Sequence, residues 1–108
     1  MLSFPSPPIT RFDGVVTGER RGRRLVVRGE VDAATAAPFA ELLARASVDP
    51  GIDVVDLRGI TFFDSRGADV LQRFELHRHR QVIGSHAVAK VLRILGTPWL
   101  LTEFADAA

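Results

Sequence analysis

The segment Asp56–Leu71, DLRGITFFDSRGADVL, constrains the fold more than any other part of the chain. It overlaps a short run rich in β-branched residues, Ile52–Leu57, which is typical of a buried strand. After Gly59 the apolar residues take helical spacing at Ala68, Val70, Leu71 and Phe74. The segment therefore predicts a strand followed closely by an amphipathic helix, with Asp64-Ser65 at the junction.

Asp64 and Ser65 are residue types that favour the start of a helix. An N-cap aspartate accepts hydrogen bonds from amides that the first helical turn leaves unpaired. Ser65 then lies in the first turn, where the helix dipole stabilises an added anion such as a phosphoryl group. Its hydroxyl is thus a candidate modification position. For the pair taken alone, an ordinary helix cap is the simpler interpretation, and nucleotide contact at this helix end is a further alternative.

Composition indicates one small globular domain without cysteine chemistry. The chain has 108 residues, of which 46% are hydrophobic and 25% are charged. A chain of this length buries roughly two thirds of its unfolded surface. Because it contains no cysteine, disulfides and thiolate metal sites are excluded. The proline- and serine-rich residues 1–10 predict an irregular tail, and residues 11–108 a single domain.

The charge balance predicts no general attraction to nucleic acid. The chain has 14 basic and 13 acidic residues, a formal net charge of +1. Arg20, Arg21, Arg23 and Arg24 cluster at a predicted hairpin turn, where solvated charge is favoured over a nucleic-acid patch. No apolar run approaches the roughly 20 residues of a membrane helix, and the amino terminus lacks a secretion signal. We therefore expect a cytoplasmic protein that contacts neither nucleic acid nor membrane directly.

The remaining periodicity predicts alternating strands and helices. Two strands joined by a turn at Gly18–Gly22 are expected over Arg11–Thr17 and Arg23–Arg28. Helices are expected over Ala33–Ser47, from Ser65 to about His79, and around Val88–Leu95 with Gly96 as the carboxyl-terminal cap. Trp99–Phe104 predicts either a last short strand or an apolar cover. The pattern is that of an α/β domain with right-handed crossovers.

Two phrases of the sequence together resemble the STAS domain of bacterial anti-sigma-factor antagonists. They are GEVDAATAAPFAELL (Gly29–Leu43) and the Asp56–Leu71 segment, followed by VLRILG and an apolar tail. The resemblance covers about Val15–Phe104. It implies a mixed β-sheet of about four to five strands, with about three or four helices packed on it.

The chain departs from the family's usual length at one place, which predicts that the fourth strand is shortened or missing. Between the second and third helices, only Arg80–Ser85 is available where the family usually has a turn and a full strand of roughly 5 residues. A sheet edge left open at this place would favour a homodimer.

A function follows from the same resemblance. In the family, the serine after the aspartate is phosphorylated by an anti-sigma factor that is itself a serine kinase, and this role carries over to Ser65. The unphosphorylated antagonist binds the anti-sigma factor and frees the sigma factor, and a serine phosphatase resets the phosphorylated form. Such partner switching regulates transcription, for example in a stress response. The residues expected to bind the partner are Gly29, Glu30, Asp32, Asp64, Ser65, Arg66, Gly67 and Asp69.

Two residues near Ser65 depart from the family's pattern. Arg66 stands where a small residue is usual, and Asp69 falls in a usually small or aliphatic pair. Asp69 is one helical turn from Ser65 and would oppose a phosphate, whereas Arg66 would partly neutralise one. One alternative is therefore a non-switching STAS scaffold or adaptor, such as a stress-signalling scaffold or a lipid-transport component. Another is a member that has lost phosphorylation and binds its partner constitutively.

No catalytic, metal or cofactor site is predicted. A triad of Ser65 with a histidine and Asp56 or Asp64 lacks the Gly-x-Ser-x-Gly turn and the oxyanion loop of a hydrolase. His77 and His79 are two residues apart, so they point to different faces of a helix, and His86 lies further along the chain. Phe62 and Phe63 are interpreted as loop residues anchored in the core. We expect a kinase substrate and binding protein rather than an enzyme.

Overall fold

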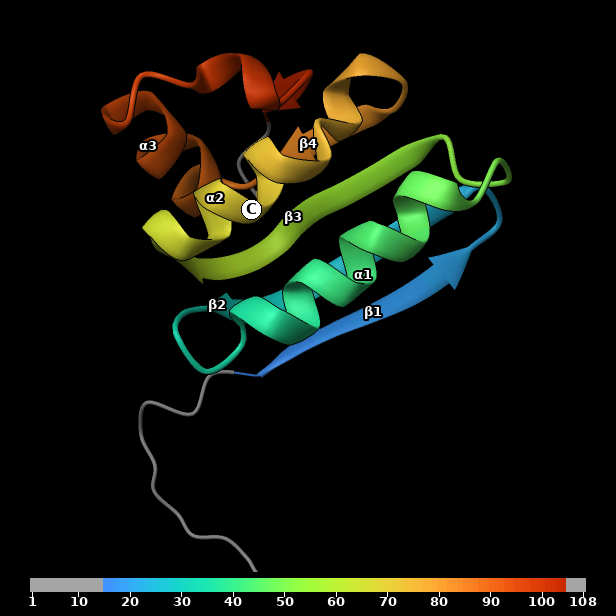
Figure 1. Ribbon diagram of the computed structural model, residues 1–108, viewed down its shortest axis with the longest axis horizontal. Coiled ribbons are helices and arrows are strands. Elements are labelled where there is room, and N and C mark those ends of the chain that lie inside the picture. Colours follow the sequence, from blue (N-terminus) through green and yellow to red (C-terminus); the bar gives the residue numbers. More distant parts are fainter. Residues whose placement is uncertain (1–14, 105–108) are drawn as a thin grey trace, which may run out of the picture.

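Five strands form one mixed sheet whose spatial order is their order along the chain (Figure 1). The structure, a computed structural model, describes residues 15–104, so the predicted tail of residues 1–10 lies outside the described part. The strands are β1 (Val16–Arg21), β2 (Arg24–Val31), β3 (Val54–Phe63), β4 (Gln81–Gly84) and β5 (Glu103–Phe104). β1 pairs antiparallel with β2, and every other pair is parallel.

Helices connect the parallel strands. They are α1 (Ala36–Val48), α2 (Ser65–Phe74) and α3 (His86–Ile94), with the short 3-10 helices η1 (Leu76–Arg78) and η2 (Pro98–Leu100). α1 and α2 lie in front of the sheet in Figure 1, and buried side chains of α3 belong to the same core. The observed fold is the α/β sheet with three main helices that the sequence predicts.

Alternation along the strands separates the two faces of the sheet. Leu25 and Val27 of β2 join the hydrophobic core, whereas Val26 between them is buried but lies outside that core. β3 follows the same rule, because Val55 and Leu57 are core residues and Asp56 between them is not. The helices therefore cover one face, and a row of polar groups lies on the other.

The first hairpin is displaced from its predicted position. β1 runs over Val16–Arg21 and turns at Gly22, where φ is +61°. The sequence pattern instead predicts the end of this strand at Thr17 and the turn at Gly18–Gly22. Gly18 lies inside the strand because α1 packs closely there: a Cβ at Gly18 would be 2.5 Å from a methyl group of Leu42. Residues 11–14 of the predicted strand lie outside the described residues.

Two further strands are longer than predicted. β2 continues through Gly29 to Val31, and β3 continues past Leu57 and Gly59 to Phe63. The pairing of β2 with β3 shifts register between Val26 and Arg28 and again after Gly29. These irregularities break the simple alternation in the sequence, which is why the strands appeared to end there.

The connection after α2 also differs from the prediction. α2 ends at Phe74, not near His79, because Glu75 adopts a left-handed conformation with φ of 48° and η1 follows. β4 is present but has four residues, which confirms a shortened fourth strand. Its outer edge is not open: β5 pairs with it at Ile83 and Gly84, and Thr102 binds both backbone groups of Val82. The predicted exposed edge beside the fourth strand is therefore wrong.

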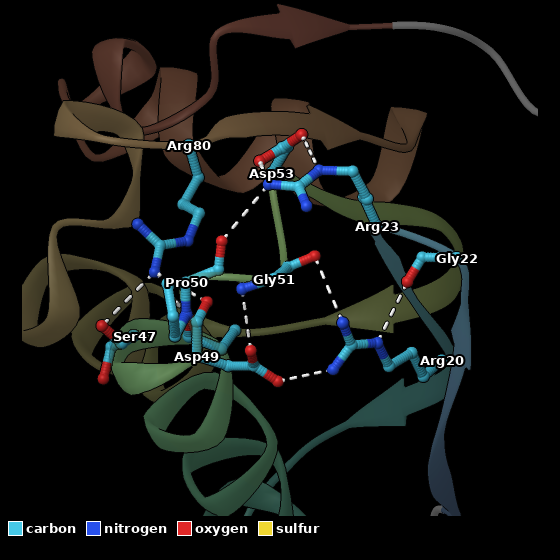
Figure 2. Close-up of polar contacts among 10 residues, drawn as sticks. Arg20, Gly22, Arg23, Ser47, Asp49, Pro50, Gly51, Asp53 and Arg80 are labelled. Carbon is cyan, nitrogen blue, oxygen red and sulfur yellow. Dashed lines mark hydrogen bonds and ion pairs between the residues drawn. The ribbon is translucent and has the colours of Figure 1, made fainter.

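Arginines from the hairpin stabilise the loop that follows α1 (Figure 2). Arg20 donates to Asp49 at 2.6 Å and to the carbonyl of Gly51, and Arg23 forms two hydrogen bonds with Asp53. Arg80 donates to the backbone carbonyls of residues 46, 47 and 49 at the end of α1, where unpaired carbonyls favour a cation. The hairpin charge is thus largely compensated within the protein, since Arg21 pairs with Glu19 and Arg24 with Asp56.

Asp56 is the most buried carboxylate of this arginine network. It is 5% exposed and accepts hydrogen bonds from the guanidinium groups of Arg58 and Arg24 and from the Arg58 backbone amide. The hydrogen bonds, chiefly those from Arg58, lower the pKa of Asp56 to about 2, although burial alone would raise it. The ionised form is therefore the stable one in the folded protein.

This lowered pKa predicts a loss of stability in acid. A carboxylate whose pKa falls on folding stabilises the folded state above its unfolded pKa, and this contribution disappears as the pH falls from about 4 towards 2. We expect Asp56 to contribute about 2 kcal/mol at neutral pH. Urea unfolding of the wild type and Asp56→Asn should show a stability difference that shrinks by about this amount between pH 6 and pH 2. Parallel pH profiles for the two proteins would contradict this assignment.

Candidate functional site

Two loops with predicted site residues leave the same edge of the sheet. β2 and β3 are parallel, and Val31 is paired with Phe63 at their carboxyl ends. The β2–α1 loop and the β3–α2 turn therefore begin side by side. We call residues 29–35 and 62–69 the candidate surface. The predicted partner-binding residues all belong to these two segments.

The β3–α2 turn has the predicted capping geometry. Asp64 is the N-cap of α2, and its side chain accepts a hydrogen bond of 2.9 Å from the amide of Arg66. Ser65 is the first residue of the helix and is exposed. Within residues 15–104, its hydroxyl has no hydrogen-bond partner in the structure. The serine is thus accessible at the positive end of a ten-residue helix.

Arg66 places a positive charge beside Asp64 at the start of α2. Its guanidinium group lies 3.1 Å from the second carboxylate oxygen of Asp64, and its side chain is 57% exposed. Asp64 is therefore engaged twice by Arg66, through the backbone and through the side chain. A phosphate on Ser65 would compete with Asp64 for this guanidinium group.

Asp69 lies one turn further along α2 and forms no ion pair within residues 15–104. It lines a groove of about 470 Å³ between α1 and α2, together with Arg66 and Arg73 from α2 and Glu41 from α1. The structure thus brings Asp69 onto the same side of the helix as the Ser65 turn. Its uncompensated charge opposes a phosphate there.

Gly67 allows α2 to pack closely on the end of β3. A Cβ at this position would lie 2.4 Å from the ring of Phe63. That ring is buried and meets Phe39 of α1 edge to face at 6.0 Å. Gly67 is therefore a structural residue of the candidate surface, and it sets how deeply the Ser65 end of α2 lies on the core.

We expect Gly67→Ala to destabilise the protein by about 1–2 kcal/mol. Alanine is the better helix former by about 1 kcal/mol, but the overlap with a ring packed between α1 and α2 outweighs this gain. Asp69→Ala, at an exposed position of the same helix, serves as the control and should change stability by less than about 0.5 kcal/mol. Equal or higher stability of Gly67→Ala in urea unfolding would contradict the close packing.

The β2–α1 loop is held by side-chain hydrogen bonds from Asp32 and Thr35 that were not predicted from the sequence. The carboxylate of Asp32 accepts from the amides of Ala34 and Thr35 at 2.9 and 3.1 Å. The buried hydroxyl of Thr35 donates to the carbonyl of Glu30 at 2.6 Å and accepts from the amide of Asp32 at 2.9 Å. Asp32 therefore shapes the loop, and the spacing of an aspartate three residues before a threonine was the available signal.

Gly29 and Glu30 differ in their roles. Gly29 has φ of 118°, and a Cβ there would lie 1.8 Å from the carbonyl oxygen of Val15. Glu30 is exposed, and its amide donates to that same oxygen at 2.9 Å. Gly29 is required by the backbone, which leaves Glu30 as the residue of this pair whose side chain is available to a partner.

Phe62 lies on the candidate surface instead of in the core. It is 51% exposed and stands opposite Glu30 in the sheet, whereas Phe63 is 4% exposed. The prediction that both rings are anchored in the core is thus correct for Phe63 and wrong for Phe62. Both residues belong to strand β3, not to a loop. The exposure of Phe62 follows from its place opposite Glu30 in the sheet, after register shifts that the sequence does not show. An exposed aromatic ring beside Asp64 is a strong candidate for partner contact.

The residues considered for other chemistry are engaged elsewhere. Asp56 is held by arginines on the sheet face opposite the helices, and the ring of His86 lies 6.2 Å from that of Phe104. Within residues 15–104, no three His, Asp or Glu side chains are grouped as metal ligands would be. In the same part of the chain, every helix is too short or too polar to cross a membrane.

Solved structures share this overall fold, although the chain matches no protein-family model and no curated protein sequence. A crystal structure of an anti-sigma factor antagonist from Mycobacterium paratuberculosis aligns with a TM-score of 0.66 at 16% identity, covering 91% of each chain. The chain has the STAS fold. The unphosphorylated form of the anti-sigma factor antagonist SpoIIAA aligns with a TM-score of 0.62 at 20% identity, covering 87% of this chain and 89% of the other. The STAS fold predicted from the sequence is thereby confirmed.

Proposed function

We propose that this protein is an anti-sigma-factor antagonist that acts by partner switching in the cytoplasm. Its candidate surface binds an anti-sigma factor, and phosphorylation of Ser65 by that partner ends the binding. The observation that carries this proposal is the exposed Ser65 hydroxyl at the start of α2, beside the β2–α1 loop, in a STAS fold. The protein is then a kinase substrate and not an enzyme, and a separate serine phosphatase restores binding.

The local structure supports a switch that leaves the fold intact. Ser65 is exposed and its hydroxyl bonds to no described residue, so a phosphoryl group is accommodated without breaking a contact. The added charge of about −1.5 to −2 lies next to Asp64 and one turn from Asp69. A partner that covers this place must remove water from a dianion flanked by carboxylates, which opposes rebinding.

Exposed side chains around Ser65 provide the contacts of the unphosphorylated state. Phe62 and Glu30 stand beside each other on neighbouring strands, and Arg66 and Asp69 lie on the first turns of α2. Asp32, Gly29 and Gly67 shape the two loops. In this proposal the first group touches the anti-sigma factor, and the second group holds the surface in place.

A phosphorylation assay tests the proposal. The protein is incubated with ATP and each anti-sigma factor of the source genome, and the modified residue is identified by mass spectrometry. We expect one phosphate on Ser65 with at least one of these partners and none on Ser65→Ala, which should still bind.

A non-switching scaffold or adaptor is the second candidate, favoured by the Arg66–Asp64 ion pair and the uncompensated Asp69. It predicts no phosphate on Ser65, and equal binding of wild type, Ser65→Ala and Ser65→Asp. That pattern would replace the switching proposal.

A further inference from the structure

The carboxyl-terminal part of the described chain carries a second surface with exposed apolar side chains. Four of the seven large apolar residues exposed in residues 15–104 lie between positions 94 and 104, and they include Trp99 at 57% and Phe104 at 46% exposure. A pocket of about 270 Å³ opens between α3, η2 and β5. Its lining includes Ala89, Leu92, Arg93, Leu101, Glu103 and Phe104.

This pocket is separate from the candidate surface. β5 is the outermost strand on one side of the sheet, whereas the loops around Ser65 leave the central strands β2 and β3. No residue of segments 29–35 or 62–69 lines the pocket. Anti-sigma factor binding at Ser65 therefore leaves this second surface without an assigned partner.

Among the described residues, the lining of the pocket carries one charge of each sign. Arg93 forms no ion pair within residues 15–104. Glu103 accepts a hydrogen bond of 2.5 Å from the neutral side-chain amide of Gln81. The pocket is thus flanked by a guanidinium group and a carboxylate, both on exposed residues.

Charges of both signs fit a second copy of the same surface. A two-fold axis places the same patch on both partners, so each contact between two different residues occurs twice. If Arg93 of one copy faces Glu103 of the other, this symmetry repeats the pair, and both pairs are attractive. A pocket rim with charges of one sign would instead repel its own copy.

We propose that this surface is the interface of a two-fold symmetric homodimer. In it, Arg93 of each copy pairs with Glu103 of the other, and the two Phe104 rings are buried against the facing pockets. Side chains around the pocket make this contact. The dimer leaves Ser65 of each copy accessible and does not depend on the proposed function.

Sedimentation equilibrium of the full chain across a concentration series tests the dimer. The wild type should show a monomer–dimer equilibrium, and Arg93→Glu or Glu103→Arg should each raise the dissociation constant at least about tenfold. The double variant Arg93→Glu/Glu103→Arg should restore dimerisation, because both pairs become attractive again. Phe104→Ser should weaken the dimer, whereas Arg73→Glu, a charge reversal on α2, should not.

The variants change exposed residues, and thermal unfolding of each one establishes that it is folded. Three results would overturn the proposal: a wild type that is monomeric throughout the series, a dimer unaffected by the single charge reversals, or a double variant that is not restored. The test needs no anti-sigma factor, so its outcome is independent of whether Ser65 is phosphorylated.

Discussion

Gly29→Ala is expected to lower the free energy of unfolding by about 3–5 kcal/mol, which is a large fraction of the stability of a small domain. Two costs combine at this position. A residue with a Cβ is strained by about 1–3 kcal/mol in a sparsely populated conformation, and φ of Gly29 is 118°. In addition, the Cβ would lie 1.8 Å from a backbone oxygen of Val15, so strand β1 must move.

Gly22→Ala is the matched control in the same hairpin. Gly22 also has positive φ, +61°, but an added Cβ would meet no atom within 4 Å. It should therefore cost only the conformational strain, about 1 kcal/mol. Urea unfolding of both variants separates the two effects, and similar losses for Gly22→Ala and Gly29→Ala would contradict the close approach of β1 to Gly29.

Phosphorylation of Ser65 is expected to weaken anti-sigma factor binding by at least about 100-fold, equivalent to about 2.8 kcal/mol. Binding requires the desolvation of a phosphate that lies beside Asp64 and near Asp69, and Arg66 is shared with Asp64. Calorimetric titration of the unmodified and phosphorylated proteins measures this change. Ser65→Asp, with a smaller charge, should lose less affinity, and Ser65→Ala should keep it.

Salt dependence separates the two causes of this loss. Repulsion between exposed charges is screened as the ionic strength rises, whereas the cost of desolvating the phosphate is screened much less. If the affinity difference persists in high salt, desolvation is the larger effect. Equal affinity of the phosphorylated and unmodified proteins at every salt concentration would contradict a switch at Ser65.

The junction at Ser65 was predictable because its determinants are local. An N-cap aspartate, the first-turn serine and the helical spacing that follows lie within a few residues of one another, and the structure places the cap hydrogen bond as expected. The order of strands and helices was predictable for the same reason. Each element has its own period and its own turn residues.

Strand boundaries were not predictable where distant segments decide them. Gly18 and Gly59 look like strand ends, yet they lie within strands because a side chain from elsewhere occupies the space of their missing Cβ: Leu42 at Gly18 and Arg28 at Gly59. The left-handed Glu75 that ends α2 has no signal in the local pattern either. The contacts of Gly18 with Leu42 and of Gly59 with Arg28 join residues separated by many positions in the chain.

The site showed the same division between local and distant information. Asp64 and Ser65 were identified from local sequence, and the Asp32–Thr35 spacing offered a local signal for the β2–α1 loop as well. Exposure of Phe62 follows from its register beside Glu30, which one sequence does not reveal. The arginine network is also set by distant partners, since Arg20 and Asp49 are 29 residues apart.

Release of a sigma factor tests the central claim most directly. A fluorescently labelled sigma factor is bound to its anti-sigma factor, and the unmodified or Ser65-phosphorylated protein is titrated into the complex while anisotropy is recorded. We predict that the unmodified protein and Ser65→Ala displace the sigma factor, and that the phosphorylated protein does so only at concentrations at least about 100-fold higher. Displacement at the same concentration by both forms, or by neither, would contradict the account.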